Sequence, residues 1–263
     1  YILTRMESDG AAFVDALQEA QRLGYAERDP SNDVKGFDTC RKLAILLSLA
    51  MGSHADYRDI YTEGIDGVNQ KNFAYAKALG CTIRLIASAR KVSVHGVESV
   101  FASVAPSLVP LSHPLASVNG SLNAVYLYGH ACGELMLYGR GAGDAPTASA
   151  VVSDMLAAAR TDCSNASAAY RMTSAVEMDT DWESRYFIRL QAVDQPGVLG
   201  AIAGILGRHG VSIASMRQTT GEGRAPLLFV THMAREKDVR AALSEIDESL
   251  ATIENVIYVE EGL

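Results

Sequence analysis

The stretch that decides the fold of the C-terminal part is YFIRLQAVDQPGVLGAIAGILGRH, residues 186–209. A strand-like run from Tyr186 to Val193 ends at the turn Asp194–Gly197, and apolar residues then recur at helical spacing as far as His209. With the elements predicted downstream, the order is βαββαβ, which predicts a ferredoxin-like unit over residues 185–263. The downstream elements are a strand from 211, a turn at 221–223, a strand over 226–233, a helix over 236–249 and a strand over 253–260.

Residues 1–160 carry a different pattern, in which helices come first and strands cluster in the middle. Helical spacing runs from 3 to 24 with a break at Asp9-Gly10, and a helix over 37–51 is apolar nearly all round, so we expect it to be buried on most sides. The pattern predicts an α/β (α+β) domain with a central, mostly β-sheet flanked by helices. Its other predicted elements are helices over 68–80 and 148–160 and strands over 82–88, 98–104, 125–128 and 134–138.

The two parts are joined by residues 161–184, where Ser, Asn, Thr, Asp and Glu dominate and periodicity fades. We expect a linker there. The length of 263 residues suits two domains. The chain begins at Tyr1 without an initiator Met, signal peptide or transit peptide, and we expect it to be cut from something longer.

Composition excludes several classes of function. A hydrophobic content of 48% indicates a chain that buries real cores. The net charge of −8 argues against binding to nucleic acid or anionic membranes, and no apolar run approaches the roughly 20 residues of a membrane span. The four cysteines form no Cys-x-x-Cys pair, which indicates reduced thiols and a cytoplasmic protein.

The segment with the clearest chemistry is GYAERDPSNDVKGFDTCRK, residues 24–42. It places four carboxylates among basic residues, and Asp38 and Lys42 lie four residues apart on one helix face. At the edge of an apolar helix, Lys42 is expected to be partly desolvated, which suits a general acid–base. The four carboxylates are Glu27, Asp29, Asp33 and Asp38.

Two plainer explanations of this segment stay open. Asp38 and Lys42 have the spacing of an ordinary solvated helix pair, and acidic loops are common on protein surfaces. A metal site is disfavoured because the acidic residues lack the strict alternation and the glycine of a calcium loop. We therefore predict no metal ligands.

Two glycine-containing turns could bind a ligand through backbone N–H groups. In GRGAGDAPTASAVVS, residues 139–153, glycines lead from a strand into a helix, which suits a phosphate or cofactor but also suits a tight turn. The turn Asp194–Gly197 offers N–H groups to a carboxylate, so ligand sensing or subunit pairing is expected there. His113, in a turn, is expected to be structural. The dinucleotide fingerprint Gly-x-Gly-x-x-Gly is absent from the sequence.

Motifs along the whole chain carry a family resemblance. Residues 1–160 resemble homoserine dehydrogenase, and residues 185–263 resemble the ACT domain that many bacterial members carry at their C-terminus. The motifs are Tyr1–Thr4, Glu19–Gln21, Gly24–Pro30, Asp33–Asp38, Lys42–Leu46, His113–Ala116 and Gly141–Val152, followed by Val193–Ala203 and Ile213–Gln218.

The resemblance implies an activity and a set of roles. The family interconverts L-homoserine and L-aspartate 4-semialdehyde with NADP or NAD in the pathway to threonine, methionine and isoleucine. Lys42 would donate the proton to the aldehyde oxygen. The resemblance further implies substrate binding by Glu27 and Asp38, with Asp33 a further candidate, cofactor contacts at Gly24, Gly141 and Gly143, and an effector, threonine, at Asp194 and Gly197.

The resemblance also implies what this chain lacks. The family's N-terminal Rossmann domain is missing from these residues, so we expect the chain alone neither to bind NAD(P) tightly nor to turn over. The alternative is a non-catalytic module that senses an amino acid and dimerises. Family members are dimers or tetramers, and the strands over 125–128 and 134–138 are the candidates for that contact.

Overall fold

The computed structural model describes residues 1–94, 97–160, 174–179, 181–219 and 223–260. The chain divides into two compact units. The first holds residues 1–105 and 109–178, and the second holds Pro106–Leu108 with the chain from Asp179 to Glu260. Among the described residues, no helix is both long and apolar enough to cross a membrane.

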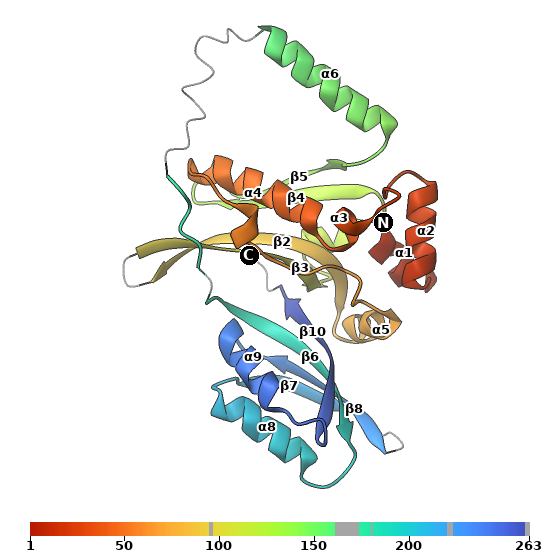
Figure 1. Ribbon diagram of the computed structural model, residues 1–263, viewed down its shortest axis with the longest axis vertical. Coiled ribbons are helices and arrows are strands. Elements are labelled where there is room, and N and C mark those ends of the chain that lie inside the picture. Colours follow the sequence, from red (N-terminus) through yellow and green to blue (C-terminus); the bar gives the residue numbers. More distant parts are fainter. Residues whose placement is uncertain (95–96, 161–173, 180, 220–222, 261–263) are drawn as a thin grey trace. The chain divides into compact units, whose positions relative to one another are not determined.

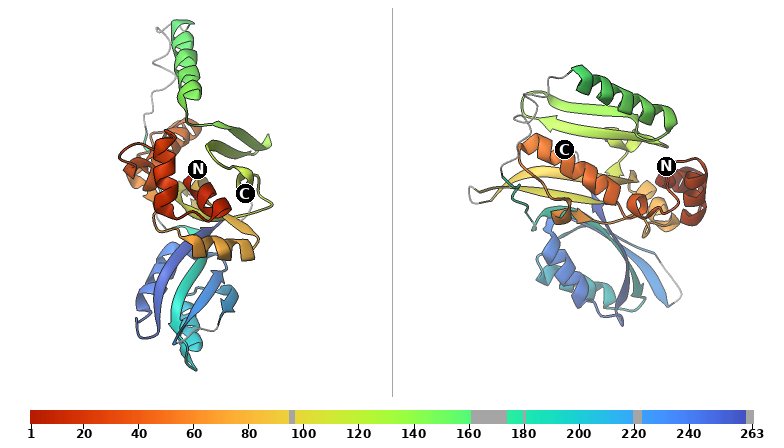
Figure 2. Two further views of the ribbon diagram at one scale, coloured as in Figure 1. Left: turned by 90° about the vertical axis from the view of Figure 1, so that its right-hand side faces the viewer. Right: turned by 45° about the horizontal axis from the view of Figure 1, so that its top comes forward.

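The first unit begins with two short helices, α1 (Ile2–Asp9) and α2 (Phe13–Arg22), which pack against each other (Figure 2). Gly10 ends α1 with φ +67°, a conformation that favours glycine, so the predicted break is confirmed. Met6 and Ala16 are fully buried, and Arg5 pairs with Glu19 at 2.8 Å. The two helices therefore pack as one pair ahead of residues 24–36, the acidic loop, which leads to helix α4 (Phe37–Met51).

The next helices are α3 (Ser31–Val34), α4 (Phe37–Met51) and α5 (Gln70–Ala78). One face of α4, including Leu43 and Leu47, packs with Val104 in a hydrophobic cluster. The expectation that α4 is buried on most sides is wrong for this chain, because Ile45 and Leu49 are more than half exposed. Apolar side chains of α4 point to all sides of the helix, but only one face packs against other described residues.

Two long strands, β2 (Cys81–Val94) and β3 (Val97–Pro110), extend well beyond the predicted 82–88 and 98–104. They pair with each other, and the short β1 (Tyr61–Thr62) runs parallel to β3. Helix α5 packs on β2. This sheet carries helices and confirms the mixed α/β character of the unit.

Strands β4 (Leu122–Gly129) and β5 (Gly133–Arg140) form an antiparallel hairpin and lead to helix α6 (Asp144–Arg160) (Figure 1). The sequence predicts both strands, but they form a two-stranded sheet of their own. No residue of α6 is buried in the described chain. Hairpin and helix thus expose apolar side chains, including Leu137, Tyr138, Val151 and Met155.

The second unit has the predicted βαββαβ order. Its main antiparallel sheet runs β10-β6-β8-β7, and α8 and α9 cover one face (Figure 1). Ile188 and Leu190 of β6 and Ile202 of α8 are completely buried. The elements are β6 (Glu183–Val193), α8 (Val198–Arg208), β7 (Ile213–Gln218), β8 (Arg224–Thr231), β9 (Ala234–Arg235), α9 (Glu236–Glu245) and β10 (Ala251–Val259).

Two predicted segments fall partly outside the described residues. Of the turn at 221–223, only Gly223 is described, with φ +79°. Of residues 161–184, the segments 174–179 and 181–184 are described. Ala175 pairs with His54, and Met178 with Val100, in isolated parallel bridges.

Candidate functional site

The acidic loop leaves helix α2 through a well-defined C-terminal turn. The N–H of Gly24 donates to the carbonyl of Gln21 at 3.1 Å, and the N–H of Tyr25 donates to that of Ala20 at 2.9 Å. This is the Schellman arrangement, and Gly24 has the positive φ of +76° that it requires. Gly24 is thus explained locally, although no atom lies within 4 Å of the place where a Cβ would stand.

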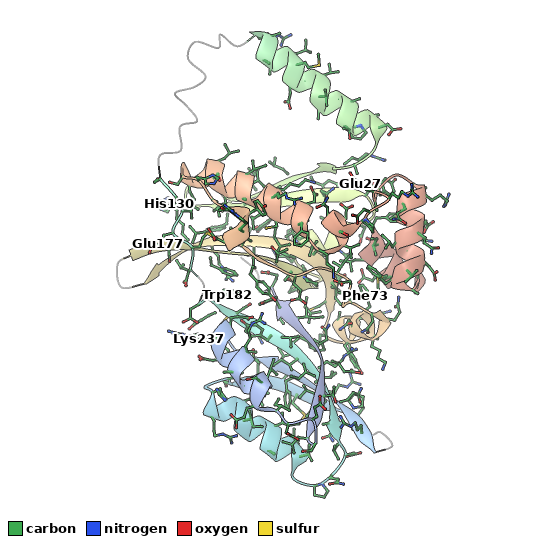
Figure 3. The ribbon with its side chains drawn as sticks, viewed as in Figure 1. Glu27, Phe73, His130, Glu177, Trp182 and Lys237 are labelled. Carbon is green, nitrogen blue, oxygen red and sulfur yellow. The ribbon has the colours of Figure 1, made fainter. Side chains whose placement is uncertain are left out.

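Beyond the turn, the loop is held back against α2. The Nε2 of Gln21 donates to the carbonyl of Glu27 at 2.9 Å and to that of Arg28 at 3.3 Å. Figure 3 labels Glu27, which lies in the loop between α2 and α3. The spacing of the sequence did not reveal this contact, because it depends on the path of the loop.

Asp29 serves the turn into α3. Its Oδ1 accepts hydrogen bonds from the backbone N–H of Ser31 at 3.1 Å and from the Ser31 hydroxyl at 2.5 Å. These donors stabilise the carboxylate and lower the pKa of Asp29 below its ordinary value. Asp29 therefore has a local role in this turn.

A second backbone contact fixes the entry to α4. The N–H of Ile65 donates to the carbonyl of Val34 at 2.8 Å. A Cβ at Gly64 would stand only 2.3 Å from that same carbonyl oxygen, so only glycine allows this approach. Lys35, next in the chain, forms an ion pair with Asp66. The segment that carries Asp33 is therefore also held by residues 64–66.

Helix α4 starts at Gly36, with φ +78°, and carries Asp38 in its first turn. The Nζ of Lys42 donates to the Oδ2 of Asp38 at 2.7 Å. The expected desolvation of Lys42 is not found, because its side chain is 66% exposed in this chain. Lys42 is the sixth residue of α4 and lies on a face of the helix that is open to water.

The structure brings the predicted substrate residues together. The pKa of Asp33 is raised, first by partial burial and then by the negative charges of Asp38 and Glu27. The backbone N–H of Glu27, which donates to Asp33, and the charge of Lys42 oppose this rise. Asp33 thus lies near two further carboxylates and one ammonium, and this local negative charge suits a cationic group on a ligand.

The glycines of 139–143 are explained by their surroundings. A Cβ on Gly141 would lie 2.0 Å from the Nδ2 of Asn123. Gly143 has φ +116° immediately before α6, and its carbonyl accepts from the N–H of Thr147 at 3.1 Å. The tight-turn alternative therefore accounts for both. Their predicted role beside a cofactor stays a prediction.

The turn Asp194–Gly197 borders a cavity of about 350 Å³. Gly197 stands at the N-cap of α8 with φ +94°. Sequence reasoning missed Gln218, which lines the same cavity from β7, although it belongs to the family motif. The remaining lining residues are Ala192–Val193, Gln195–Pro196, Val198–Leu199 and Leu227.

Two further expectations can be compared with the structure. His113 is structural, since its Nδ1 accepts from the N–H of Leu115 at 3.2 Å and its ring lies 5.0 Å from that of Tyr126. In the described parts of the chain, no three His, Cys, Asp or Glu side chains are grouped so that they would hold a metal ion.

Comparison with known proteins identifies the families whose sequence profiles match this chain. The homoserine dehydrogenase profile matches residues 1–156, and the ACT domain profile matches residues 186–250. Homoserine dehydrogenase of Mycobacterium tuberculosis H37Rv is 43% identical over 267 residues, covering 97% of this chain and 59% of that protein. That of Synechocystis is 42% identical, covering 98% of this chain and 63% of the relative.

Solved structures show a similarity to the same family. The homoserine dehydrogenase of Thiobacillus denitrificans superimposes with a TM-score of 0.86 at 35% identity, over 99% of this chain and 61% of that one. The enzyme of S. aureus at pH 6.5 gives 0.71 at 28% identity, over 100% and 62%. This chain thus spans about three fifths of the length of these proteins.

Proposed function

We propose, because this chain belongs to the homoserine dehydrogenase family, that it carries the substrate side of an enzyme that interconverts L-homoserine and L-aspartate 4-semialdehyde. The observation that carries the proposal is the grouping of Glu27, Asp38 and Lys42 near Asp33, with Lys42 paired to Asp38 at 2.7 Å. Both substrates contain an ammonium group and an oxygen that changes its protonation. A cluster of carboxylates beside a lysine provides for both needs.

In the proposed mechanism, Glu27 and Asp38 bind the substrate ammonium, and Asp33 adds negative charge behind them. Lys42 donates a proton to the aldehyde oxygen during reduction and accepts it during oxidation. When bound, NADP or NAD supplies or accepts the hydride at the neighbouring carbon. Gly24 fits a cofactor because the space where its Cβ would lie is open, and Gly141 fits poorly because Asn123 fills the corresponding space.

The division of labour follows the sequence boundaries. Residues 1–160 form the catalytic, substrate-binding and dimerisation domain, residues 161–184 the linker, and residues 185–263 the ACT regulatory domain. The protein is cytoplasmic and a homodimer or homotetramer. Exposed apolar side chains on the β4–β5 hairpin support a contact between subunits there: Leu127, Tyr128, Leu135, Leu137 and Tyr138.

The regulatory proposal concerns the cavity at Asp194–Gly197. Backbone N–H groups at the start of α8 bind the carboxylate of an effector amino acid, threonine, and Asp194 binds its ammonium. The cavity of about 350 Å³ supports this assignment because it is large enough for one amino acid. In the alternative function, the chain keeps only this sensing and dimerisation role.

The deciding experiment measures homoserine oxidation by the protein expressed from its complete coding sequence, with NAD⁺ and NADP⁺ in parallel. Turnover with homoserine, and none with serine, is expected. The 263-residue chain alone is expected to give none, while calorimetry detects its binding of threonine. Absence of homoserine turnover by the complete protein would leave the sensing function as the better account.

A further inference from the structure

Two glutamines of the first unit make the same kind of contact in different places. Gln21 donates through Nε2 to the carbonyls of Glu27 and Arg28, at 2.9 and 3.3 Å. Gln70 donates through Nε2 to the carbonyls of Met6 and Ala11, at 2.8 and 2.6 Å. Each side chain thus joins its own helix to the backbone of another segment. Only the first of them holds a segment that carries the proposed substrate ligands.

We propose that Gln21 is a positioning residue that fixes the Glu27 carboxylate for homoserine binding. The inference rests on the proposed function of the acidic loop. The carbonyl of Glu27 accepts from the Nε2 of Gln21 at 2.9 Å, and the next carbonyl, that of Arg28, accepts from the same Nε2 at 3.3 Å. Two hydrogen bonds from one side chain therefore anchor the backbone beside the α-carbon of Glu27 and limit the direction of its side chain.

These anchors matter because Glu27 is exposed and lies in a loop. Without them, the loop would have to be ordered when homoserine binds, and that cost would weaken binding. Lys42 is fixed separately, since it lies on α4, whose buried face belongs to the hydrophobic cluster. Loss of the Gln21 contact therefore affects the substrate KM and leaves kcat nearly unchanged.

The test compares Gln21→Met with Gln70→Met in the protein expressed from its complete coding sequence. Each change keeps the size of the side chain and removes a donor to two carbonyls. Gln21→Met is expected to raise the homoserine KM about tenfold, because it weakens the charge-assisted contact between the Glu27 carboxylate and the substrate ammonium. The kcat and the cofactor KM stay within about twofold. Gln70→Met leaves all three parameters unchanged, although both variants lower the Tm by similar amounts.

Two more variants make the result decisive. Gln21→Lys retains an N–H donor and is expected to keep the homoserine KM within about threefold of the parent. Glu27→Gln is expected to raise this KM at least as much as Gln21→Met. If Glu27→Gln raises it and Gln21→Met does not, or if Gln70→Met raises it equally, the positioning role is overturned. If Glu27→Gln changes nothing, the substrate site itself is wrong, and the role of Gln21 is refuted along with it.

Discussion

The acidic loop and the turn at Asp194–Gly197 enter their helices in the same way. Gly36 and Gly197 are the N-cap residues of α4 and α8, with φ +78° and +94°, and neither helix has a side-chain cap. The first turns differ, because α4 carries Asp38 there and α8 carries no acidic residue. The positive end of α4 is therefore balanced by a carboxylate of its own.

This difference predicts opposite ligands. At α4, the helix start is already neutralised, and the surplus carboxylates of the loop attract a cation. At α8, the first turn contains no acidic residue and borders the cavity that Asp194 also lines, so its backbone N–H groups suit the carboxylate of an effector. In the proposed function, one type of backbone entry thus serves catalysis in the first unit and sensing in the second. Single substitutions at the two helix starts test this comparison, from the largest expected effect to the smallest.

Replacement of Lys42 by Ala removes the proposed proton donor and is expected to lower kcat roughly 100- to 10,000-fold. The Tm should change little, because the Lys42 side chain is exposed and its pair with Asp38 is screened by solvent. Steady-state kinetics on the complete protein measure the effect. Lys35→Ala is the matched control, since Lys35 lies near the same helix start but pairs with Asp66. A loss of only about threefold in kcat for Lys42→Ala would mean that Asp38 and Lys42 form an ordinary solvated ion pair without a catalytic role.

Replacement of Asp38 by Asn makes the start of α4 resemble that of α8. The homoserine KM is expected to rise about tenfold, because a charge-assisted contact to the ammonium becomes a neutral one. The control is Asp29→Asn, which keeps an oxygen to accept from Ser31 and should leave the KM within about twofold. Equal effects of the two substitutions would mean that the net charge of the loop matters and the position of Asp38 does not.

Parts of this arrangement were predictable from the sequence because they depend on local order. The βαββαβ pattern, the break at Gly10 and the helix from Phe37 to Met51 all follow from periodicity and glycine placement. The exposed face of α4 did not follow, because uniformly apolar sequence does not show which side finds a partner. The contacts of Gln21 and the place of Gln218 depend on loop paths and on strand packing, which spacing does not encode.

Replacement of Gly197 by Ala tests the second unit. A Cβ is strained at φ +94°, at a cost of about 1–2 kcal/mol, so the turn shifts and the N–H groups at the start of α8 lose their alignment. Calorimetry with threonine is expected to show about fivefold weaker binding, with the homoserine KM unchanged. Gly200→Ala, inside α8 with open space around its Cβ position, should leave binding intact and stabilise the unit. Unchanged threonine affinity in Gly197→Ala would remove the turn from the effector site.

Substitution of Asp33 is expected to have the smallest effect on the homoserine KM, and the direction of its effect on stability follows from the raised pKa of Asp33. Its pKa is raised above the ordinary 3.8 by burial and by the neighbouring carboxylates, so the folded protein holds this proton more tightly than the unfolded chain. The cost of ionising Asp33 appears as the pH rises above 3.8 and is complete above the raised pKa. Asp33→Asn should therefore stabilise the protein near neutral pH, by at most about 0.5 kcal/mol after solvent screening, and have no effect in acid.

Substrate binding should follow the opposite trend, since the ammonium of homoserine favours ionised Asp33. In the parent protein the homoserine KM is expected to rise as the pH falls towards the raised pKa of Asp33, and in Asp33→Asn to be about threefold higher at about pH 7 and flatter with pH. Asp66→Asn is the control, because Lys35 lowers the pKa of Asp66. Asp66 therefore stabilises the fold above pH 3.8 and loses that contribution as the pH falls through its lowered pKa. Its removal should destabilise the protein at neutral pH without changing the KM profile. The same direction in both thermal scans would contradict the raised pKa of Asp33, and an unchanged KM profile in Asp33→Asn would contradict its assignment to the substrate site.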